Sequence, residues 1–347
     1  MSKGPLGSGR NPEGGDAREE AGTLGLGSVE HLVLVAPTAS GKSEIALRAA
    51  EALGDIEIVS IDSMQVYRGM DIGTAKVDAE ARERVPHHMI DVIDPWQVWS
   101  VQQFQIEARK AVADIESRGK RALLVGGTGL YVQAVIDDLR FPGEDLVLRA
   151  EIEARTAEPG GIAAAYERLL AADPLAASRI DPHNVRRIVR ALEVIEKTGE
   201  PFSSFGPGLD RYGPTAFPVR IAGLWLSRDV TALRIHERFD AMRVGGLVDE
   251  VRALRAEPRG WSRTARQAIG YKELEEVLDM ERDLENSSET ELDSAFVDAF
   301  ETAKRRTRSF SRRQRMWFRR DPRITWFGAV EKIEDTTPAL LAWWGAA

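Results

Sequence analysis

Eight residues near the start of the chain have the types and spacing of a phosphate-binding loop. They follow the apolar run 32–35 and read Ala36-Pro37-Thr38-Ala39-Ser40-Gly41-Lys42-Ser43. In such a loop, backbone N–H groups and the N-terminus of the next helix bind phosphate oxygens. The lysine neutralises the terminal phosphates and the serine hydroxyl binds Mg²⁺. The sequence therefore predicts that this segment binds a diphosphate or triphosphate, with Lys42 and Ser43 as its main side-chain ligands.

The first position of the loop departs from the usual pattern, because Ala36 stands where glycine is typical. Alanine fits if φ is negative there, whereas a positive φ would require glycine. We therefore expect a negative φ at Ala36. The alternative is a chance Gly-Lys-Ser in an ordinary turn, and the strand-like and helix-like flanks argue against it.

Asp62 is the second candidate for chemistry, because it ends the strand-like segment 56–61. A carboxylate at a strand end beside a phosphate loop could hold Mg²⁺ through water, or it could act as a general base. It could also be a turn or N-cap residue. The strand-like segment 121–125 ends in Gly126-Gly127-Thr128 and offers no carboxylate. The segment 63–76 is either a functional loop or a packed connector.

These residues must be positioned by strands that alternate with helices. We expect strands at 29–35, 56–61, 121–125, 219–226 and 324–327, and helices at 42–53, 101–117, 162–172, 184–198, 229–256, 271–282 and 290–318. This alternation predicts an α/β fold, a P-loop NTPase-like parallel sheet flanked by helices. Ligands of such sheets bind at the carboxyl ends of the strands, where the loop, Asp62 and Thr128 all fall.

The chain divides into four segments by composition. Residues 1–28 contain eight glycines and are interpreted as a disordered leader. Residues 29–140 form the first part of the α/β core, 141–205 an inserted all-helical subdomain, and 206–347 the return to the core with C-terminal basic helices.

Composition excludes several classes of protein. The 347 residues contain no cysteine and five scattered histidines, which argues against disulfides and a zinc site. No apolar run is long enough to span a membrane, and we expect a cytoplasmic protein. The net charge of −8 argues weakly against nucleic acid. However, residues 302–320 contain nine basic residues and no acidic one, which is typical either of a phosphate-backbone contact or of a helix paired with acidic neighbours.

The motifs together resemble those of bacterial tRNA dimethylallyltransferases, also called tRNA isopentenyl transferases. The resemblance covers about 32–328. It rests on the phosphate loop and on the segments Asp62-Ser63-Met64-Gln65-Val66-Tyr67-Arg68-Gly69-Met70-Asp71-Ile72-Gly73-Thr74-Ala75-Lys76, Pro86-His87-His88-Met89-Ile90-Asp91, Val125-Gly126-Gly127-Thr128-Gly129-Leu130-Tyr131 and Gln267-Ala268-Ile269-Gly270-Tyr271-Lys272-Glu273.

The resemblance implies a transfer reaction. The five-carbon group of dimethylallyl diphosphate would pass to N6 of the adenosine 3′-adjacent to the anticodon, and diphosphate would leave. The loop residues, with Mg²⁺, would hold the diphosphate. Asp62 would accept the N6 proton, and Arg228 would reach the diphosphate from outside the loop. The residues implied to contact the tRNA anticodon stem-loop are Asp62, Ser63, Met64, Gln65, Thr128, Arg186, Arg187 and Arg190, with added backbone contacts from the basic helix around Arg312-Arg313-Gln314.

Three alternatives stay open on the residues alone. A small-molecule P-loop kinase would use ATP, but it leaves the basic segment and the helical insertion without a purpose. An adenylate isopentenyltransferase would perform the same chemistry on free AMP. A non-catalytic tRNA-binding protein would not need Lys42, Ser43 and Asp62. Of the oligomeric states we expect a monomer.

Overall fold

The computed structural model describes residues 27, 29–137, 139–205, 209, 211–283, 289–328 and 333–345. Two compact units divide the chain: a helical unit within 138–211, and a larger unit built from the segments on either side of it. The predicted leader lies outside the described residues apart from Gly27. No described helix is long and apolar enough to cross a membrane.

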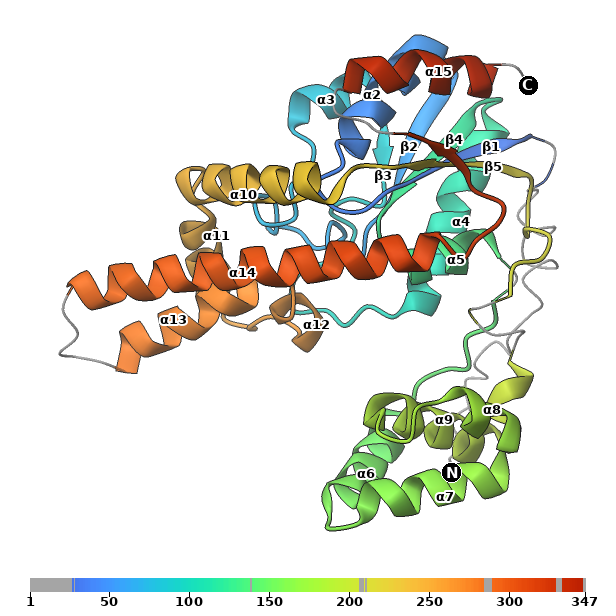
Figure 1. Ribbon diagram of the computed structural model, residues 1–347, viewed down its shortest axis with the longest axis vertical. Helices are drawn as coiled ribbons and strands as arrows, with labels where there is room; N and C mark the ends of the chain where they lie inside the picture. Colours follow the sequence, from blue (N-terminus) through green and yellow to red (C-terminus); the bar gives the residue numbers. More distant parts are fainter. Residues whose placement is uncertain are drawn as a thin grey trace, which may run out of the picture. The chain divides into compact units, whose positions relative to one another are not determined.

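The larger unit is organised around one parallel sheet (Figure 1). Its strands are β1 (His31–Val35), β2 (Ile56–Ile61), β3 (His87–His88), β4 (Arg121–Gly126), β5 (Val219–Leu224) and β6 (Thr325–Phe327). Their order across the sheet is β3-β2-β4-β1-β5-β6, and every neighbouring pair is parallel. The predicted parallel α/β fold is therefore confirmed. The apolar, β-branched strands are buried on both faces, as parallel strands usually are.

Helices cover both faces of this sheet. The helices of the larger unit are α2 (Lys42–Leu53), α3 (Ala79–Arg84), α4 (Val101–Ser117), α5 (Gly129–Ile136), α10 (Arg228–Val244), α11 (Leu247–Arg255), α12 (Arg263–Arg266), α13 (Tyr271–Asp283), α14 (Glu289–Phe318) and α15 (Ile333–Gly345). On one face, α2 and α15 pack on alternate residues of the strands, such as Leu32 and Leu34. On the other, α4 and α5 pack on Val33 and Val35.

The described part of the helical unit contains four α-helices around a core of its own. They are α6 (Leu146–Ala157), α7 (Gly161–Ala172), α8 (Pro174–Arg179) and α9 (Val185–Thr198), followed by a short 3₁₀ turn at Phe202–Ser204. Ile152, Leu169, Ile188 and Leu192 are among the buried residues that hold the unit together. Burial of these side chains is the main source of its stability.

Some elements differ from the sequence-based expectations. The helix expected at 229–256 is two helices, because Gly245-Gly246 interrupts it and Gly246 takes a φ of 93°. Strand β3 and helices α3, α5, α12 and α15 were not expected, and α6 and α8 were expected only as part of an all-helical region at 141–205. Helix α5 begins at Gly129, directly after Gly126-Gly127-Thr128, a sequence that is typical of a break, although the helix then buries Val132, Val135 and Ile136.

Candidate active site

The phosphate-loop segment, residues 36–43, connects β1 to the first turn of α2 and has an unusual backbone conformation. Ala39 and Gly41 lie in the left-handed region, with φ of 60° and 81°. Ala36 is not among the described residues with positive φ, so its negative φ is confirmed. Gly41 caps the N-terminus of α2, and Lys42 and Ser43 are the first two residues of that helix. A non-glycine residue such as Ala39 in this region is uncommon and is found most often at functional sites.

Lys42 and Asp62 lie on the same pocket. Its lining includes Lys42, Ser43, Asp62 and Gln65, with apolar walls from Ala46, Ile58, Val77, Ile90 and Val125. Burial lowers the pKa of the Lys42 ammonium, the Asp62 carboxylate opposes this shift, and the positive charge of Arg238 adds to it. The parallel sheet therefore brings the two candidate groups together at the carboxyl ends of β1 and β2, as expected.

Asp62 combines a turn contact with an open oxygen. Its Oδ1 accepts hydrogen bonds from the backbone N–H groups of Met64 at 2.8 Å and Gln65 at 3.4 Å. Within the part of the chain that the structure describes, Oδ2 accepts none. The turn interpretation thus applies to one carboxylate oxygen, while the other is available to a ligand in the pocket.

The segment after Asp62 is internally hydrogen-bonded. Gln65 accepts a hydrogen bond from the Ser60 hydroxyl at 2.8 Å through Oε1, and its Nε2 donates to the Thr74 carbonyl at 3.2 Å. Ser63 and Met64 are half-buried beside it. The Gln65 side chain is therefore committed to its own segment, and its contribution to the site is to hold that segment in place.

Two arginines of α10 reach the phosphate loop. Arg234 Nη1 donates to the Ser40 carbonyl at 3.0 Å, and Arg238 Nη1 donates to the Thr38 hydroxyl at 3.2 Å. Burial lowers the pKa of the Arg238 guanidinium, whereas the Asp62 carboxylate raises it. Because residues four apart share a helix face, the two guanidinium groups act on the same loop. The Arg-x3-Arg spacing was the signal in the sequence that could have identified them.

Arg228, the third arginine of interest on α10, differs from Arg234 and Arg238 in its contacts. It is the exposed first residue of α10, and no hydrogen bond or ion pair joins it to the loop among the described residues. Arg228 lies six residues before Arg234, which is about one and two-thirds turns of a helix. The two side chains therefore leave α10 on different faces. The charge of Arg228 instead lowers the pKa of Arg315, although burial is the larger cause of that shift. The geometry favours Arg234 and Arg238 for contact with the diphosphate, because both hydrogen-bond to the loop. The expected contact of Arg228 with the diphosphate stays a prediction.

A buried glutamine of α14 joins the phosphate loop to the end of β4. Gln314 Oε1 accepts a hydrogen bond from the Thr38 backbone N–H at 2.9 Å, and its Nε2 donates to the Gly127 carbonyl at 2.8 Å. A Cβ at Gly127 would lie 2.7 Å from that Nε2, so only glycine permits this approach. Thr128 follows as the N-cap of α5, at the strand end where it was expected. From the sequence, Gln314 was placed only in a basic helix, and its hydrogen bonds to Thr38 and Gly127 were not predicted.

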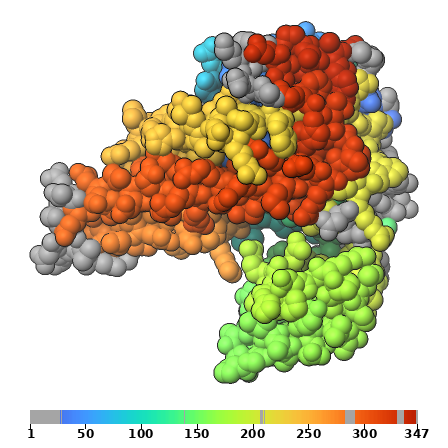
Figure 2. Space-filling model, viewed as in Figure 1, coloured from blue at the N-terminus to red at the C-terminus, as the bar shows by residue number. Residues whose placement is uncertain are grey.

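The basic residues of α14 fall into two groups. Lys304 is buried against Asp240 and Glu301, and Arg306 pairs with Glu273, so both follow the acidic-neighbour interpretation. Arg315 and Arg319 instead lie over the Trp225 ring, 4.9 and 5.6 Å from its centroid. The exposed arginines of this helix and the turn after it are Arg305, Arg312, Arg313, Arg319 and Arg320. Figure 2 shows α14 and α10 lying on the surface of the larger unit.

Three arginines of the helical unit were expected to bind tRNA, and they differ in whether their side chains are exposed or engaged within the unit. Arg186 and Arg187 are exposed in the first turn of α9. Arg190, one turn later, donates to the Pro142 carbonyl and lies 2.9 Å from a carboxylate oxygen of Glu193. Arg190 is therefore engaged in the fold of its own unit, and the other two are open to a partner.

The chain is similar in sequence to known transferases over most of its length. A family model described as IPP transferase matches residues 65–321. A tRNA dimethylallyltransferase of Bifidobacterium longum is 44% identical over 314 residues, which cover 89% of this chain and 90% of that protein. One from Salinispora arenicola is 46% identical over 301 residues, covering 86% and 82%.

Solved structures that resemble this chain are also tRNA isopentenylpyrophosphate transferases or dimethylallyltransferases. The crystal structure of a tRNA isopentenylpyrophosphate transferase from Bacillus halodurans superposes with a TM-score of 0.62 at 38% identity, covering 91% of this chain and 96% of that one. A eukaryotic dimethylallyltransferase, described as acting on tRNA, gives a TM-score of 0.72 at 26% identity, covering 91% and 78%.

The fold and site together define a class: parallel α/β proteins in which the first strand leads through a glycine-containing loop into a helix, with an inserted helical unit. Within that class, the chain belongs to the IPP transferase family.

Proposed function

We propose that this chain is a tRNA dimethylallyltransferase. It transfers the dimethylallyl group of dimethylallyl diphosphate to the N6 amine of the adenosine 3′-adjacent to the anticodon. The observation that carries the proposal is the pocket that Lys42, Ser43 and Asp62 share, with one Asp62 oxygen left open. The names of the relatives that match most of the chain support it.

The reaction requires one bond to form while another breaks. The N6 nitrogen attacks the first carbon of the dimethylallyl group, the bond from that carbon to the diphosphate oxygen breaks, and the proton leaves N6. Asp62 Oδ2 is the proposed proton acceptor, because Asp62 lines the pocket and this oxygen accepts no hydrogen bond from the described residues. The apolar walls contributed by Ile58, Val77 and Ile90 suit a five-carbon hydrocarbon group.

The leaving diphosphate gains negative charge as the bond breaks. Lys42 and the N-terminus of α2 are arranged to stabilise that charge, and Arg234 and Arg238 approach the same loop from α10. Donors that are already in place when charge develops usually provide the largest catalytic contribution. The binding of diphosphate also favours the protonated form of Lys42, which burial disfavours in its absence.

Mg²⁺ fits these residues as a diphosphate-bound ion. The described residues contain no group of three acidic, histidine or cysteine side chains that could hold a metal by themselves. Mg²⁺ is commonly bound by one or two protein oxygens together with substrate phosphates and waters. The Ser43 hydroxyl would hold it, and the ion would supply additional neutralisation of the diphosphate charge.

The acceptor RNA requires basic groups that remain available. We propose that Arg186 and Arg187 of the helical unit contact its backbone, and that the exposed arginines of α14 do so from the larger unit. Enzymes that modify a base move it out of its stack into a pocket, and an anticodon loop allows this at low cost. Such an enzyme works where tRNA is found, so we propose a cytoplasmic protein, and a monomer.

A panel of acceptors tests this proposal. Radiolabelled dimethylallyl diphosphate and Mg²⁺ are incubated with unmodified tRNA, with an anticodon stem-loop, or with AMP, and label transferred to each is counted. We expect label in both RNAs and none in AMP. Label in AMP alone would indicate an adenylate isopentenyltransferase. No transfer, together with ATP consumption in the presence of metabolite hydroxyls, would indicate a kinase.

A further inference from the structure

The segment 71–73 is held by a carboxylate from a distant helix. Glu250 of α11 accepts hydrogen bonds from three consecutive backbone N–H groups: Asp71 at 3.0 Å, Ile72 at 2.7 Å and Gly73 at 3.2 Å. Consecutive N–H groups that converge in this way form an anion-binding concavity. Here the bound anion is a side chain that lies 177 residues away from Gly73 in the chain.

Tyr271 completes the binding of this carboxylate. Its hydroxyl donates to Glu250 Oε1 at 2.6 Å, and its ring is buried. A Cβ at Gly73 would lie 2.3 Å from that ring, so glycine is required for the segment to pass it. Burial raises the pKa of the Tyr271 hydroxyl, and the Glu250 charge raises it further, which keeps the hydroxyl a donor.

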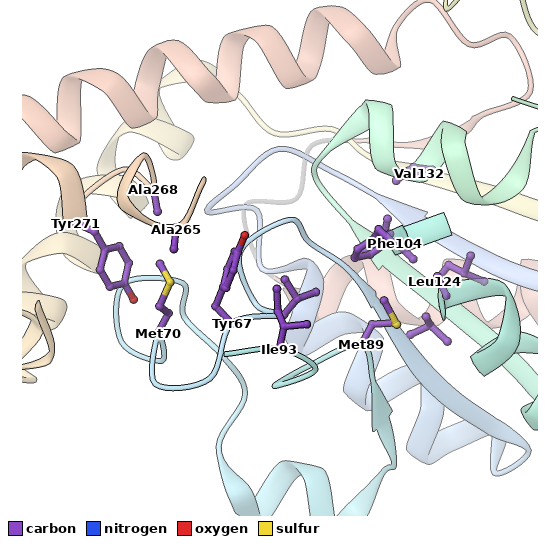
Figure 3. Close-up of a cluster of buried hydrophobic side chains, with 14 of the residues drawn as sticks. Tyr67, Met70, Met89, Ile93, Phe104, Leu124, Val132, Ala265, Ala268 and Tyr271 are labelled. Atoms are coloured by element: carbon purple, nitrogen blue, oxygen red, sulfur yellow. The ribbon is translucent and has the colours of Figure 1, made fainter. Parts of the chain in front are cut away.

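Apolar side chains anchor the same segment. Figure 3 shows Met70 beside Tyr271 and Tyr67, near Ala265 and Ala268. All five side chains belong to the core of the larger unit. The position of the backbone at 70–73 is therefore set by both packing and the Glu250 carboxylate.

A short chain of hydrogen bonds connects this anchored segment to Asp62. The Thr74 and Ala75 carbonyls, directly after Gly73, accept from Gln65 Nε2 at 3.2 and 3.4 Å. The Gln65 backbone N–H in turn donates to Asp62 Oδ1. Gln65 thus connects segment 74–75 to the turn that Asp62 Oδ1 stabilises.

We propose that Glu250 is a positioning residue: by holding segment 71–73 it fixes Gln65 and thereby the direction of the Asp62 carboxylate toward the acceptor. The proposal rests on the proposed function. Glu250 itself accepts hydrogen bonds from backbone groups and Tyr271, and it is not among the residues that line the pocket of Lys42 and Asp62. Catalytic groups that are misplaced by about 1 Å can lose on the order of 100-fold in rate.

Glu250→Gln tests the proposal, because the amide keeps the size of the side chain but turns one acceptor into a donor facing N–H groups. We expect kcat for transfer to fall about 10- to 100-fold, while the KM for dimethylallyl diphosphate and the Kd for the anticodon stem-loop change less than about threefold. Glu250→Asp keeps the charge and should recover part of the rate. Asp249→Asn, on the same helix but exposed, is the matched control and should leave kcat unchanged.

A double-mutant cycle distinguishes positioning of Asp62 from a general structural effect. If Glu250 acts through Asp62, the rate loss caused by Glu250→Gln should largely disappear in an Asp62→Asn background. Rate losses that simply multiply, an unchanged kcat, or a loss confined to RNA affinity would each overturn the proposal. Thermal unfolding confirms that the variants are folded at the assay temperature. If the unaltered protein transfers nothing, it is the proposed function that fails.

Discussion

At the scale of single residues, the site depends on how each carboxylate oxygen and guanidinium group is used. Asp62 Oδ1 stabilises the turn that follows β2, while Oδ2 accepts no hydrogen bond from the described residues, and Asp62 lines the pocket shared with Lys42. One side chain therefore fixes its own backbone and presents a proton acceptor. This division explains why the turn interpretation and the catalytic interpretation of Asp62 are compatible.

Asp62→Asn should separate these two uses, because the amide oxygen can still accept from Met64 and Gln65 while the proton acceptor is lost. We expect kcat to fall on the order of 10²- to 10⁴-fold with little change in RNA affinity. Single-turnover transfer and a filter-binding assay measure the two quantities. A variant with full turnover would exclude Asp62 as the base.

Arg234→Ala and Arg228→Ala form a matched pair on one helix. Hydrogen bonds to charged groups contribute about 1.5–3 kcal/mol, so loss of Arg234 should lower kcat/KM for the donor about tenfold or more. Loss of Arg228 should change kcat/KM for the donor less than about twofold. The comparison is steady-state kinetics with dimethylallyl diphosphate as the varied substrate. Equal effects of the two variants would mean that Arg228 also reaches the diphosphate.

The sequence predicted those site residues that lie at the ends of neighbouring strands. Lys42 and Asp62 follow β1 and β2, and the parallel sheet dictates that both strand ends share one edge. Gln314, Arg234 and Glu250 could not be predicted in the same way. Their partners lie 276, 194 and about 178 residues away, and only the packing of helices brings them together.

At the scale of elements, α10 and α14 lie across the carboxyl edge of the sheet and supply the side chains that reach the phosphate loop. Helix α14 was predicted at 290–318, one residue after its observed start at Glu289, and α10 was predicted as part of a single helix at 229–256. The contacts of these helices were not predicted, because a basic helix can face either solvent or an acidic neighbour. The structure assigns Lys304 and Arg306 to acidic neighbours and leaves Arg312 and Arg313 exposed.

Charge reversal on α14 tests its exposed face. Arg312→Glu/Arg313→Glu should weaken binding of the anticodon stem-loop and reduce the slope of log K against log salt by about 1 to 2, as expected when two phosphate contacts are lost. The matched control is Arg84→Glu/Lys110→Glu, since these exposed residues lie on α3 and α4. A salt titration that gives the same slope for all three proteins would show that α14 does not contact RNA.

At the scale of the whole molecule, a buried histidine at the start of the sheet links stability to pH. His31 is fully buried; its Nδ1 accepts from the Ala122 backbone N–H at 3.0 Å, and its Nε2 donates to Glu116 at 3.2 Å. Burial lowers the pKa of His31, and the Glu116 hydrogen bond only partly opposes this. The ring is therefore neutral in the folded protein, with both nitrogens satisfied.

The sign of the pH effect follows from this lowered pKa. Below the unfolded pKa of about 6.5, the unfolded chain binds a proton that the folded protein resists, so stability is lost as pH falls from 6.5 toward the folded pKa. We expect the free energy of unfolding in urea to decrease between pH 7.5 and 5.5. The decrease should be smaller for His31→Gln, which is less stable overall but does not titrate. Equal decreases would contradict a role for His31.

Analysis of the nucleosides in treated tRNA tests most directly whether this protein transfers a dimethylallyl group to adenosine. The protein is incubated with Mg²⁺, dimethylallyl diphosphate and unmodified tRNA, and the digested nucleosides are weighed by mass spectrometry. We expect the unaltered protein to form adenosine that is heavier by one dimethylallyl group. The yield of this nucleoside should be greatly reduced with Lys42→Ala. Adenosine that stays unmodified with the unaltered protein, under conditions where it is folded and binds the tRNA, would contradict the account.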